Sequence, residues 1–125
     1  MQLNKTLRLA CDGESGSGKS TAAKAISLKY RLFCMNSGLL FRFASYLIIK
    51  QKPKKIIPFL RKKFKNLNYK KITRLNLHTE EISNHVAILA KQKKVRQIIR
   101  VFQKQIIRRH HRICCEGRDQ ASTIL

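Results

Sequence analysis

The chain is poor in acidic residues, in glycine and in long apolar runs, and it has no tryptophan. Only six of its 125 residues are Asp or Glu, against 28 Lys and Arg, so its formal net charge is +22. No apolar run approaches the roughly 18 residues that a membrane span needs, and the N-terminus has no apolar signal-peptide core. We therefore expect a cytoplasmic protein that has no membrane partner.

Cysteine is sparse as well, and its spacing argues against a metal site. Cys11, Cys34, Cys114 and Cys115 form no C-x-x-C pair, which is the spacing typical of zinc and redox sites. All four fall in segments that are predicted below to be strands. We expect them to be buried thiols and expect no bound metal at these positions.

Glycine is concentrated in one place, because three of the five glycines lie between Gly13 and Gly18. Residues 13–20 match the phosphate-binding pattern G-x-x-x-x-G-K-[ST]. The glycines allow successive N–H groups to converge on one anion. In this pattern Lys19 reaches the β- and γ-phosphates, and Ser20 offers its hydroxyl to Mg²⁺. A predicted strand at 7–11 and a predicted helix at 20–30 flank the loop, which is the order that a nucleoside triphosphate site requires.

The remaining periodicity predicts an α/β protein. We expect further strands at 32–35 and 112–116 and helices at 39–50, 79–92 and 93–109. The prediction is one partial domain over residues 1–125, a P-loop type three-layer core around a parallel sheet of about three strands. That length is short for such a sheet. Residues 51–78 are expected to form a mobile, basic, mostly helical insert.

The positive charge permits two interpretations. No acidic residue occurs between Ser15 and Thr79, and such a surface would attract nucleic acid without sequence specificity. A drift of the composition towards Lys on solvated faces would give the same count.

Three separated segments resemble the bacterial cytidylate kinases, a family of P-loop nucleoside monophosphate kinases. They are residues 11–21 (CDGESGSGKST), 36–42 (NSGLLFR) and 116–119 (EGRD). The resemblance implies a monomer that transfers a phosphoryl group from ATP to CMP or dCMP with the help of Mg²⁺. It implies that ATP is held by Gly13, Glu14, Ser15, Gly16, Ser17, Gly18, Lys19, Ser20 and Thr21.

The resemblance also assigns roles to residues outside the loop, and it makes residues 51–78 the expected insert that binds the acceptor nucleotide. Ser37 and Arg42 resemble the ligands of the acceptor phosphate, and Arg96 and Asp119 resemble the pair that reads cytosine. Arg118 resembles a second phosphate ligand, and with Lys19 it is the expected catalytic group. The sequence departs from the family at three positions, where Glu14 replaces proline, Asn36 replaces aspartate and Ala87 replaces a cytosine-binding serine.

The resemblance extends over nearly the whole chain but over only about the first half of such an enzyme. The given sequence lacks the later strands and the lid arginines of the family. We therefore expect a weak or inactive kinase, either a fragment or a shortened gene product. Two alternatives stay open at this point. The chain could be a basic nucleic-acid-binding protein with a kinase-like core, or another small-molecule P-loop kinase.

Overall fold

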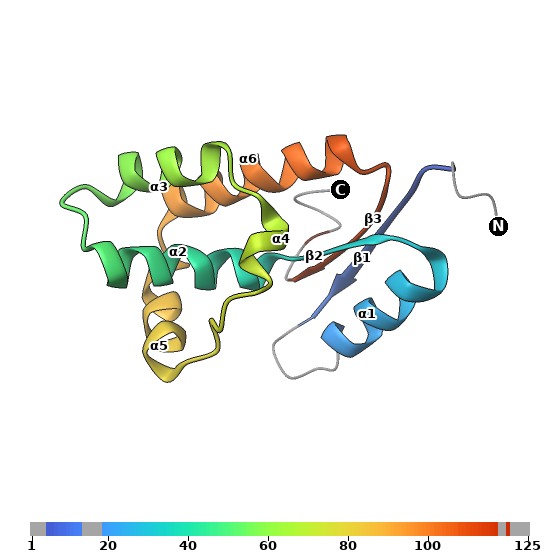
Figure 1. Ribbon diagram of the computed structural model, residues 1–125, viewed down its shortest axis with the longest axis horizontal. Coiled ribbons are helices and arrows are strands. Elements are labelled where there is room, and N and C mark those ends of the chain that lie inside the picture. Colours follow the sequence, from blue (N-terminus) through green and yellow to red (C-terminus); the bar gives the residue numbers. More distant parts are fainter. Residues whose placement is uncertain (1–4, 14–18, 118–119, 121–125) are drawn as a thin grey trace. The chain divides into compact units, whose positions relative to one another are not determined.

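The computed structural model describes residues 5–13, 19–117 and 120. Three strands and six helices follow one another along these residues (Figure 1). Their bounds are β1 (Leu7–Asp12), α1 (Lys19–Tyr30), β2 (Phe33–Asn36), α2 (Ser37–Gln51), α3 (Ile56–Lys65), α4 (Tyr69–Ile72), α5 (Glu80–Leu89), α6 (Lys93–Arg109) and β3 (Arg112–Gly117).

The three strands form one parallel sheet in the order β1-β3-β2. The last strand in the sequence is therefore the middle strand of the sheet. Leu9 pairs with Cys114, which pairs in turn with Cys34. Because all three strands run the same way, their carboxyl ends meet at one edge of the sheet. The predicted α/β class with a parallel three-stranded sheet is confirmed.

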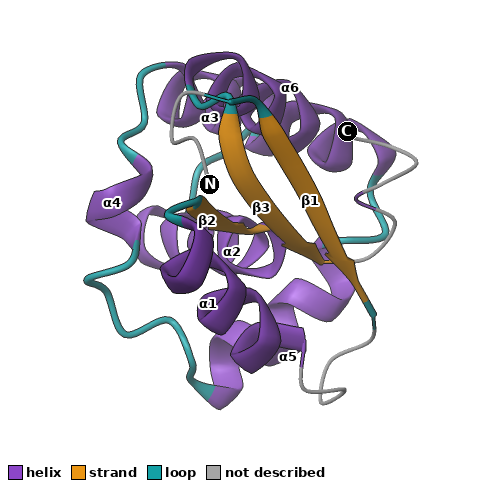
Figure 2. Cartoon of the chain, turned by 90° about the vertical axis from the view of Figure 1, so that its right-hand side faces the viewer, coloured by secondary structure: helices purple, strands orange, loops and turns teal. Residues whose placement is uncertain are grey.

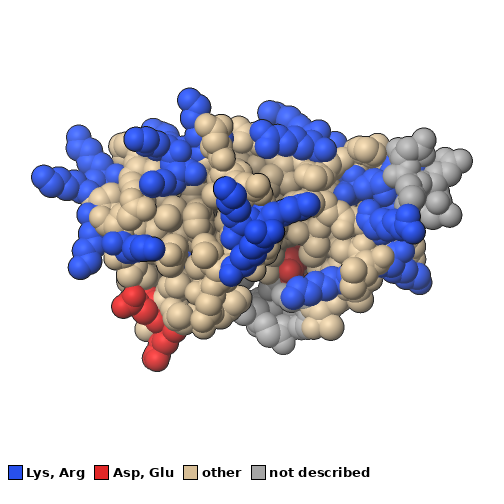
Figure 3. Space-filling view, viewed as in Figure 1, with Lys and Arg blue, Asp and Glu red and all other residues tan. Residues whose placement is uncertain are grey.

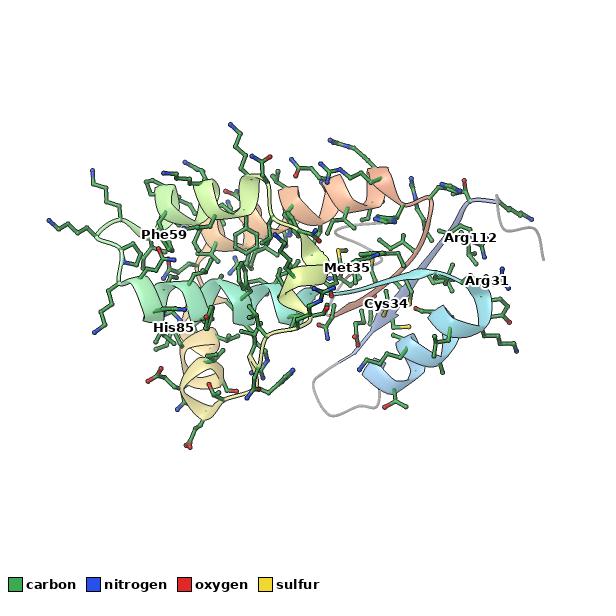
Figure 4. The ribbon with its side chains drawn as sticks, viewed as in Figure 1. Arg31, Cys34, Met35, Phe59, His85 and Arg112 are labelled. Carbon is green, nitrogen blue, oxygen red and sulfur yellow. The ribbon has the colours of Figure 1, made fainter. Side chains whose placement is uncertain are left out.

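Helix α1 packs against one face of this sheet (Figure 2). Ala23 from the helix, Leu32 after it and Cys114 from β3 are the buried centre of the packing. The partly buried residues around them are Leu7, Leu9, Cys11, Ile26, Tyr30 and Cys34. At the opposite end of β3 from its carboxyl edge, the buried Arg112 donates hydrogen bonds to the carbonyls of Lys5 and Tyr30 (Figure 4).

The chain divides into two compact units. Unit 1 comprises Met1–Ser37 and Gln103–Leu125 and contains the sheet and α1, and unit 2 comprises Gly38–Phe102. In unit 2, Phe64 of α3 contacts Phe43 and Phe102, with ring centroids 6.0 and 5.6 Å away. His85 of α5 is joined to the buried Ser45 of α2, with 2.8 Å between Nδ1 and Oγ. These contacts hold α2, α3, α5 and α6 together.

Most predicted elements are confirmed, and two boundaries differ from the prediction by more than one residue. Helix α2 begins at Ser37, directly after β2, where a turn was expected before residue 39. Helix α5 is capped by Thr79, whose Oγ1 accepts from the N–H of Ile82 at 3.2 Å. It ends at Leu89, three residues earlier than predicted. The basic segment 51–78 contains α3 and α4, so its helical character is confirmed, while its mobility stays a prediction.

Across the described ranges, none of the helices combines the length and the apolar character that crossing a bilayer requires. Nor does this part of the chain bring three or more His, Cys, Asp or Glu side chains together as a metal site would.

Candidate nucleotide-binding site

The carboxyl edge of the sheet brings together three segments that lie far apart in the sequence. Asp12 pairs with Gly117, and Asn36 pairs with Glu116. Gly13 follows β1, and Ser37 follows β2. Ligands of open α/β sheets bind outside this edge. The structure therefore places Gly13, Ser37 and Gly117, which belong to the three segments, at one edge of the sheet.

Gly13 and Gly117 are joined through their backbones at this edge. The N–H of Gly13 donates to the carbonyl of Gly117 at 3.1 Å. Gly117 has φ +152°, a conformation that side chains disfavour. A Cβ there would collide with the Ser37 side chain and would come within 3.0 Å of Gln120 Nε2. Only glycine therefore fits between the first loop and the start of α2.

A chain of polar contacts connects Gln120 to the end of β1 and to α6. Asp12 Oδ1 accepts a hydrogen bond from the backbone N–H of Gln120 at 2.6 Å. The buried Gln120 side chain in turn accepts from Gln103 Nε2 at 3.3 Å. Asp12 thus has a structural partner, although sequence reasoning placed it only beside the phosphate loop.

Glu116 is the buried carboxylate of this edge. It is 1% exposed, and its Oε2 has no hydrogen-bond partner among the described residues. Side chains alternate along a strand, so Glu116 lies on the same face as Cys114, the face that α1 covers. An unpaired buried carboxylate is costly, and such groups are retained where a cation or another ligand completes them. Sequence reasoning noted that Glu116 borders the Gly-Arg pair but did not select it as a site residue.

Several predicted site residues cannot be placed. Glu14, Ser15, Gly16, Ser17, Gly18, Arg118 and Asp119 lie outside the described residues, and Lys19 and Ser20 are described only as the first residues of α1. Thr21 follows them in the first turn of α1 and is exposed. Ser37 is 8% exposed, and its hydroxyl lies against Gly117. The ligand roles of all these residues stay predictions.

Arg42 belongs to unit 2, where its guanidinium is held by two acceptors. Nη1 donates to the carbonyl of Leu77 at 3.1 Å and to the Ser83 hydroxyl at 3.0 Å. Leu77 is fully buried, and Arg42 and Ser83 are partly buried. Ser83 lies one turn before Ala87 on α5, so the two residues share a face of the helix. Ser83 was missed by sequence reasoning, because no local pattern links it to an arginine 41 positions earlier.

Arg96 lies on the first turns of α6, also in unit 2. Its Nη1 donates to the carbonyl of Ala90, the C-cap residue of α5, at 2.9 Å. The same turn is closed by the N–H of Gln92, which donates to the carbonyl of Leu89 at 3.0 Å. Arg96 therefore stabilises the α5–α6 turn, while its expected role in reading cytosine stays a prediction.

None of the four thiols forms a disulfide. Cys11 Sγ and Cys114 Sγ are 3.7 Å apart on neighbouring strands. Burial raises the pKa of Cys114 to about 12, assisted by its contact with Cys11. Burial likewise raises the pKa of Cys115 to about 12 and shifts the pKa of Cys34 upward. The thiols of Cys34, Cys114 and Cys115 therefore stay protonated near neutral pH, which fits the expected role of core side chains.

The sequence profile of the cytidylate kinases matches residues 9–125. The chain belongs to the cytidylate kinase family. It is 29% identical to the cytidylate kinase of Mesomycoplasma hyopneumoniae strain 7448 over 133 aligned positions, which include 97% of this chain and 58% of that protein. It is 30% identical to the cytidylate kinases of Aquifex aeolicus strain VF5 and Clostridioides difficile strain 630, covering 95% and 94% of this chain and 59% of each relative.

The family match includes every segment that carried the resemblance, from the strand before the phosphate loop to the Gly-Arg-Asp segment. The chain spans about three fifths of the length of the curated relatives that it matches. Membership of the cytidylate kinase family is therefore established over the nucleotide-loop half of the fold.

Proposed function

We propose that this chain carries the donor and acceptor sites for phosphoryl transfer from ATP to CMP or dCMP. The observation that carries the proposal is the shared carboxyl edge, where Gly13 at the start of the expected phosphate loop, Ser37 and Gly117 lie. Membership of the cytidylate kinase family supports the choice of acceptor.

In the proposed reaction, a phosphate oxygen of CMP attacks the γ-phosphorus of ATP. The bond from that phosphorus to the β–γ bridging oxygen breaks, which yields CDP and ADP. The reaction requires positioning and charge neutralisation and no covalent nucleophile on the protein. We assign Gly13 to Thr21 to ATP, with Lys19 neutralising the developing charge. Ser37, Arg42 and Arg118 bind the acceptor phosphate, and Arg96 and Asp119 bind the cytosine.

The buried edge also fits Mg²⁺. Hard cations take oxygen ligands, and Glu116 supplies a buried carboxylate oxygen without a partner in the described structure. We propose that the Ser20 hydroxyl and Glu116 hold Mg²⁺, directly or through water. The ion would draw the β- and γ-phosphate oxygens together and reduce their negative charge.

The charge of the chain favours anionic substrates in general, which makes base selectivity a separate question. Ala87 stands where the family has a cytosine-binding serine, and one missing hydrogen bond is worth about 0.5–1.5 kcal/mol. We therefore expect CMP and dCMP to be preferred over other acceptors by a reduced margin.

The state of the cysteines supports a cytoplasmic location for this activity. All four are free, although Cys11 and Cys114 bring their sulfurs within 3.7 Å. Free thiols persist in reducing compartments, whereas secreted proteins form disulfides. We propose the cytoplasm on this ground and a monomeric state as the simplest assembly.

Isothermal titration with ATP and with CMP tests the proposal directly. We expect saturable binding of both, loss of ATP binding in Lys19→Ala, and retained CMP binding in that variant. A coupled assay over CMP, dCMP, UMP and AMP then ranks the acceptors. Unchanged ATP affinity in Lys19→Ala would remove the phosphate-loop assignment, and exclusive use of UMP or AMP would remove the cytidylate assignment.

A further inference from the structure

The positive charge of unit 2 is far greater than its expected substrates require. Residues 38–102 contain seventeen Lys and Arg and only two acids, Glu80 and Glu81. Both acids lie in the first turn of α5, where they stabilise the helix N-terminus. Arg42 and Arg96 are partly buried and donate to backbone carbonyls. The other fifteen cations are exposed. Figure 3 shows Lys and Arg side chains projecting at many places on the visible face, among uncharged residues and with little acidic surface.

The densest part of this charge lies on α3, α4 and the residues that follow each of them. Twelve residues between 61 and 76 are exposed. Seven of them are cationic, and we call these seven the basic face: Arg61, Lys62, Lys63, Lys65, Lys70, Lys71 and Arg74. The other five are Asn66, Asn68, Thr73, Leu75 and Asn76. Cations are thus interleaved with neutral hydrogen-bonding side chains.

The packing of apolar side chains from α3 and α4 keeps the basic face exposed to solvent. Leu60 and Phe64 of α3 are 1% and 3% exposed, and Tyr69 and Ile72 of α4 are 8% and 1% exposed. The Phe64 ring makes edge-to-face contacts with the rings of Phe43 and Phe102. Because the apolar residues anchor both helices, the charged residues between them cannot turn into the core.

The basic face carries uncompensated repulsion. Arg61 and Lys65 are one helical turn apart, and such like-charged pairs cost about 0.2–0.5 kcal/mol each. Cations near the C-terminus of α3 recover about 0.3–1 kcal/mol from the helix dipole, which explains Lys62, Lys63 and Lys65. It does not explain Lys70, Lys71 and Arg74, which belong to or follow a helix of four residues. A polyanion lying on the face would remove this repulsion.

The composition of the face selects the kind of polyanion. A membrane-surface helix needs an exposed apolar side, whereas Leu75, at 39% exposed, is the one large apolar side chain among the exposed residues of 61–76. Base stacking needs exposed aromatic rings, but Phe64 and Tyr69 are buried, and Lys63 lies over the half-buried Phe59 ring at 5.7 Å. Lys, Arg, Asn and Thr are side chains that contact the phosphates and sugars of nucleic acids.

We propose that the basic face binds the phosphodiester backbone of nucleic acid, without base specificity, as a function separate from phosphoryl transfer. The binding is electrostatic and is driven by the release of counterions. Its strength therefore depends on salt, and each cation that contacts a single strand contributes about 0.7 to the slope of log K against log salt concentration.

The test is fluorescence anisotropy with labelled 20-nucleotide RNA and DNA single strands of mixed sequence, at several salt concentrations. The face variant is Arg61→Gln/Lys62→Gln/Lys65→Gln. The matched control removes the same charge from exposed residues of unit 1, as Arg8→Gln/Lys104→Gln/Arg108→Gln. We expect the face variant to lose about 2 from the slope and about 100-fold in affinity at 0.1 M salt, while the control keeps the parent slope.

Circular dichroism and thermal unfolding of both variants verify that they fold like the parent chain. Equal slope losses in both variants would overturn the proposal, because the charge would then act diffusely. Displacement of RNA by saturating ATP and CMP would overturn it too, since the strand would then occupy the nucleotide sites. Tighter binding to anionic lipid vesicles than to RNA at equal phosphate concentration would assign the face to membranes instead. None of these readouts requires kinase activity, so the outcome is independent of the proposed function.

Discussion

Arg42 and Ser83 are joined by a hydrogen bond of 3.0 Å between Nη1 and Oγ, across 41 positions of sequence. The buried carbonyl of Leu77 accepts from the same nitrogen at 3.1 Å. Two acceptors on one nitrogen fix the direction of a side chain that would otherwise populate many rotamers. Arg42 is thus held in one orientation by contacts within the protein.

Substitution of Ser83 tests the importance of this orientation. We expect Ser83→Ala to weaken CMP binding about fivefold, because one hydrogen bond of about 1 kcal/mol no longer orients Arg42. ATP binding should be unchanged. Ser83→Thr retains the hydroxyl and should retain CMP affinity. Isothermal titration measures both ligands, and equal weakening of ATP and CMP binding would mean that Ser83 only supports the fold.

Glu116→Gln tests the buried carboxylate. The substitution keeps the shape of the side chain and removes its charge, so a cation at the carboxyl edge of β3 would lose its anionic ligand. We expect ATP affinity measured with Mg²⁺ to fall about tenfold, and ATP affinity measured in EDTA to stay level or rise. An equal fall under both conditions would argue that Glu116 has a role other than holding Mg²⁺.

Gly117→Ala tests the close approach at the sheet edge. The φ of +152° and the collision of a new Cβ with Ser37 should lower the free energy of unfolding by about 1–3 kcal/mol. Ser37→Ala in the same chain removes the hydroxyl from the collision, so the double variant should lose less than the sum of the single variants. Urea unfolding measures all three, and strict additivity would contradict the contact.

We expect the Cys115 thiol to make the free energy of unfolding decrease as the pH rises above about 9. Its pKa is about 12 in the folded protein, against about 8.5 for an unperturbed thiol. Above that lower value the unfolded chain loses a proton that the folded chain retains, so raising the pH favours unfolding. The stability should be level with respect to this thiol below pH 8 and should fall by about 1.4 kcal/mol per pH unit from about pH 9 towards 12.

The variant Cys115→Ala should remove that part of the alkaline slope, whatever it does to the stability at neutral pH. Denaturant unfolding at half-unit pH steps provides the measurement. If the free energy of unfolding of the variant falls with alkaline pH as steeply as that of the parent chain, other groups cause the effect.

Local signals predicted the elements of this protein well, because each has a chemical boundary. The Thr79 hydroxyl followed by two acids marks the start of α5, and the side chain does cap the helix. Pro58 falls in the first turn of α3, where proline is tolerated. The end of α5 was wrong by three residues, since a tertiary bond from Arg96 to Ala90 closes the turn there.

Contacts between residues far apart in the sequence could not be predicted from local sequence patterns. The phosphate-loop pattern predicted the strand and helix around it but not the strand order, which depends on β3 pairing with both earlier strands. Glu116 could have been selected because it is the last residue of the predicted strand 112–116 and is followed by glycine. No pattern in the sequence predicts the hydrogen bond between Arg42 and Ser83 or the one between Gln120 and Asp12.

The strand order also governs the sequence of events when the chain is made. β1 and β2 are not neighbours, and in the described residues each pairs with β3, which begins at residue 112. On the ribosome, both early strands must therefore wait for this pairing until residues 112–117 have emerged. The intervening residues 38–102 form a compact unit from one contiguous stretch, so they can begin to collapse first. In nascent chains that are halted before residue 112, we therefore expect the helices of residues 38–102 to resist protease, while β1 is still cleaved.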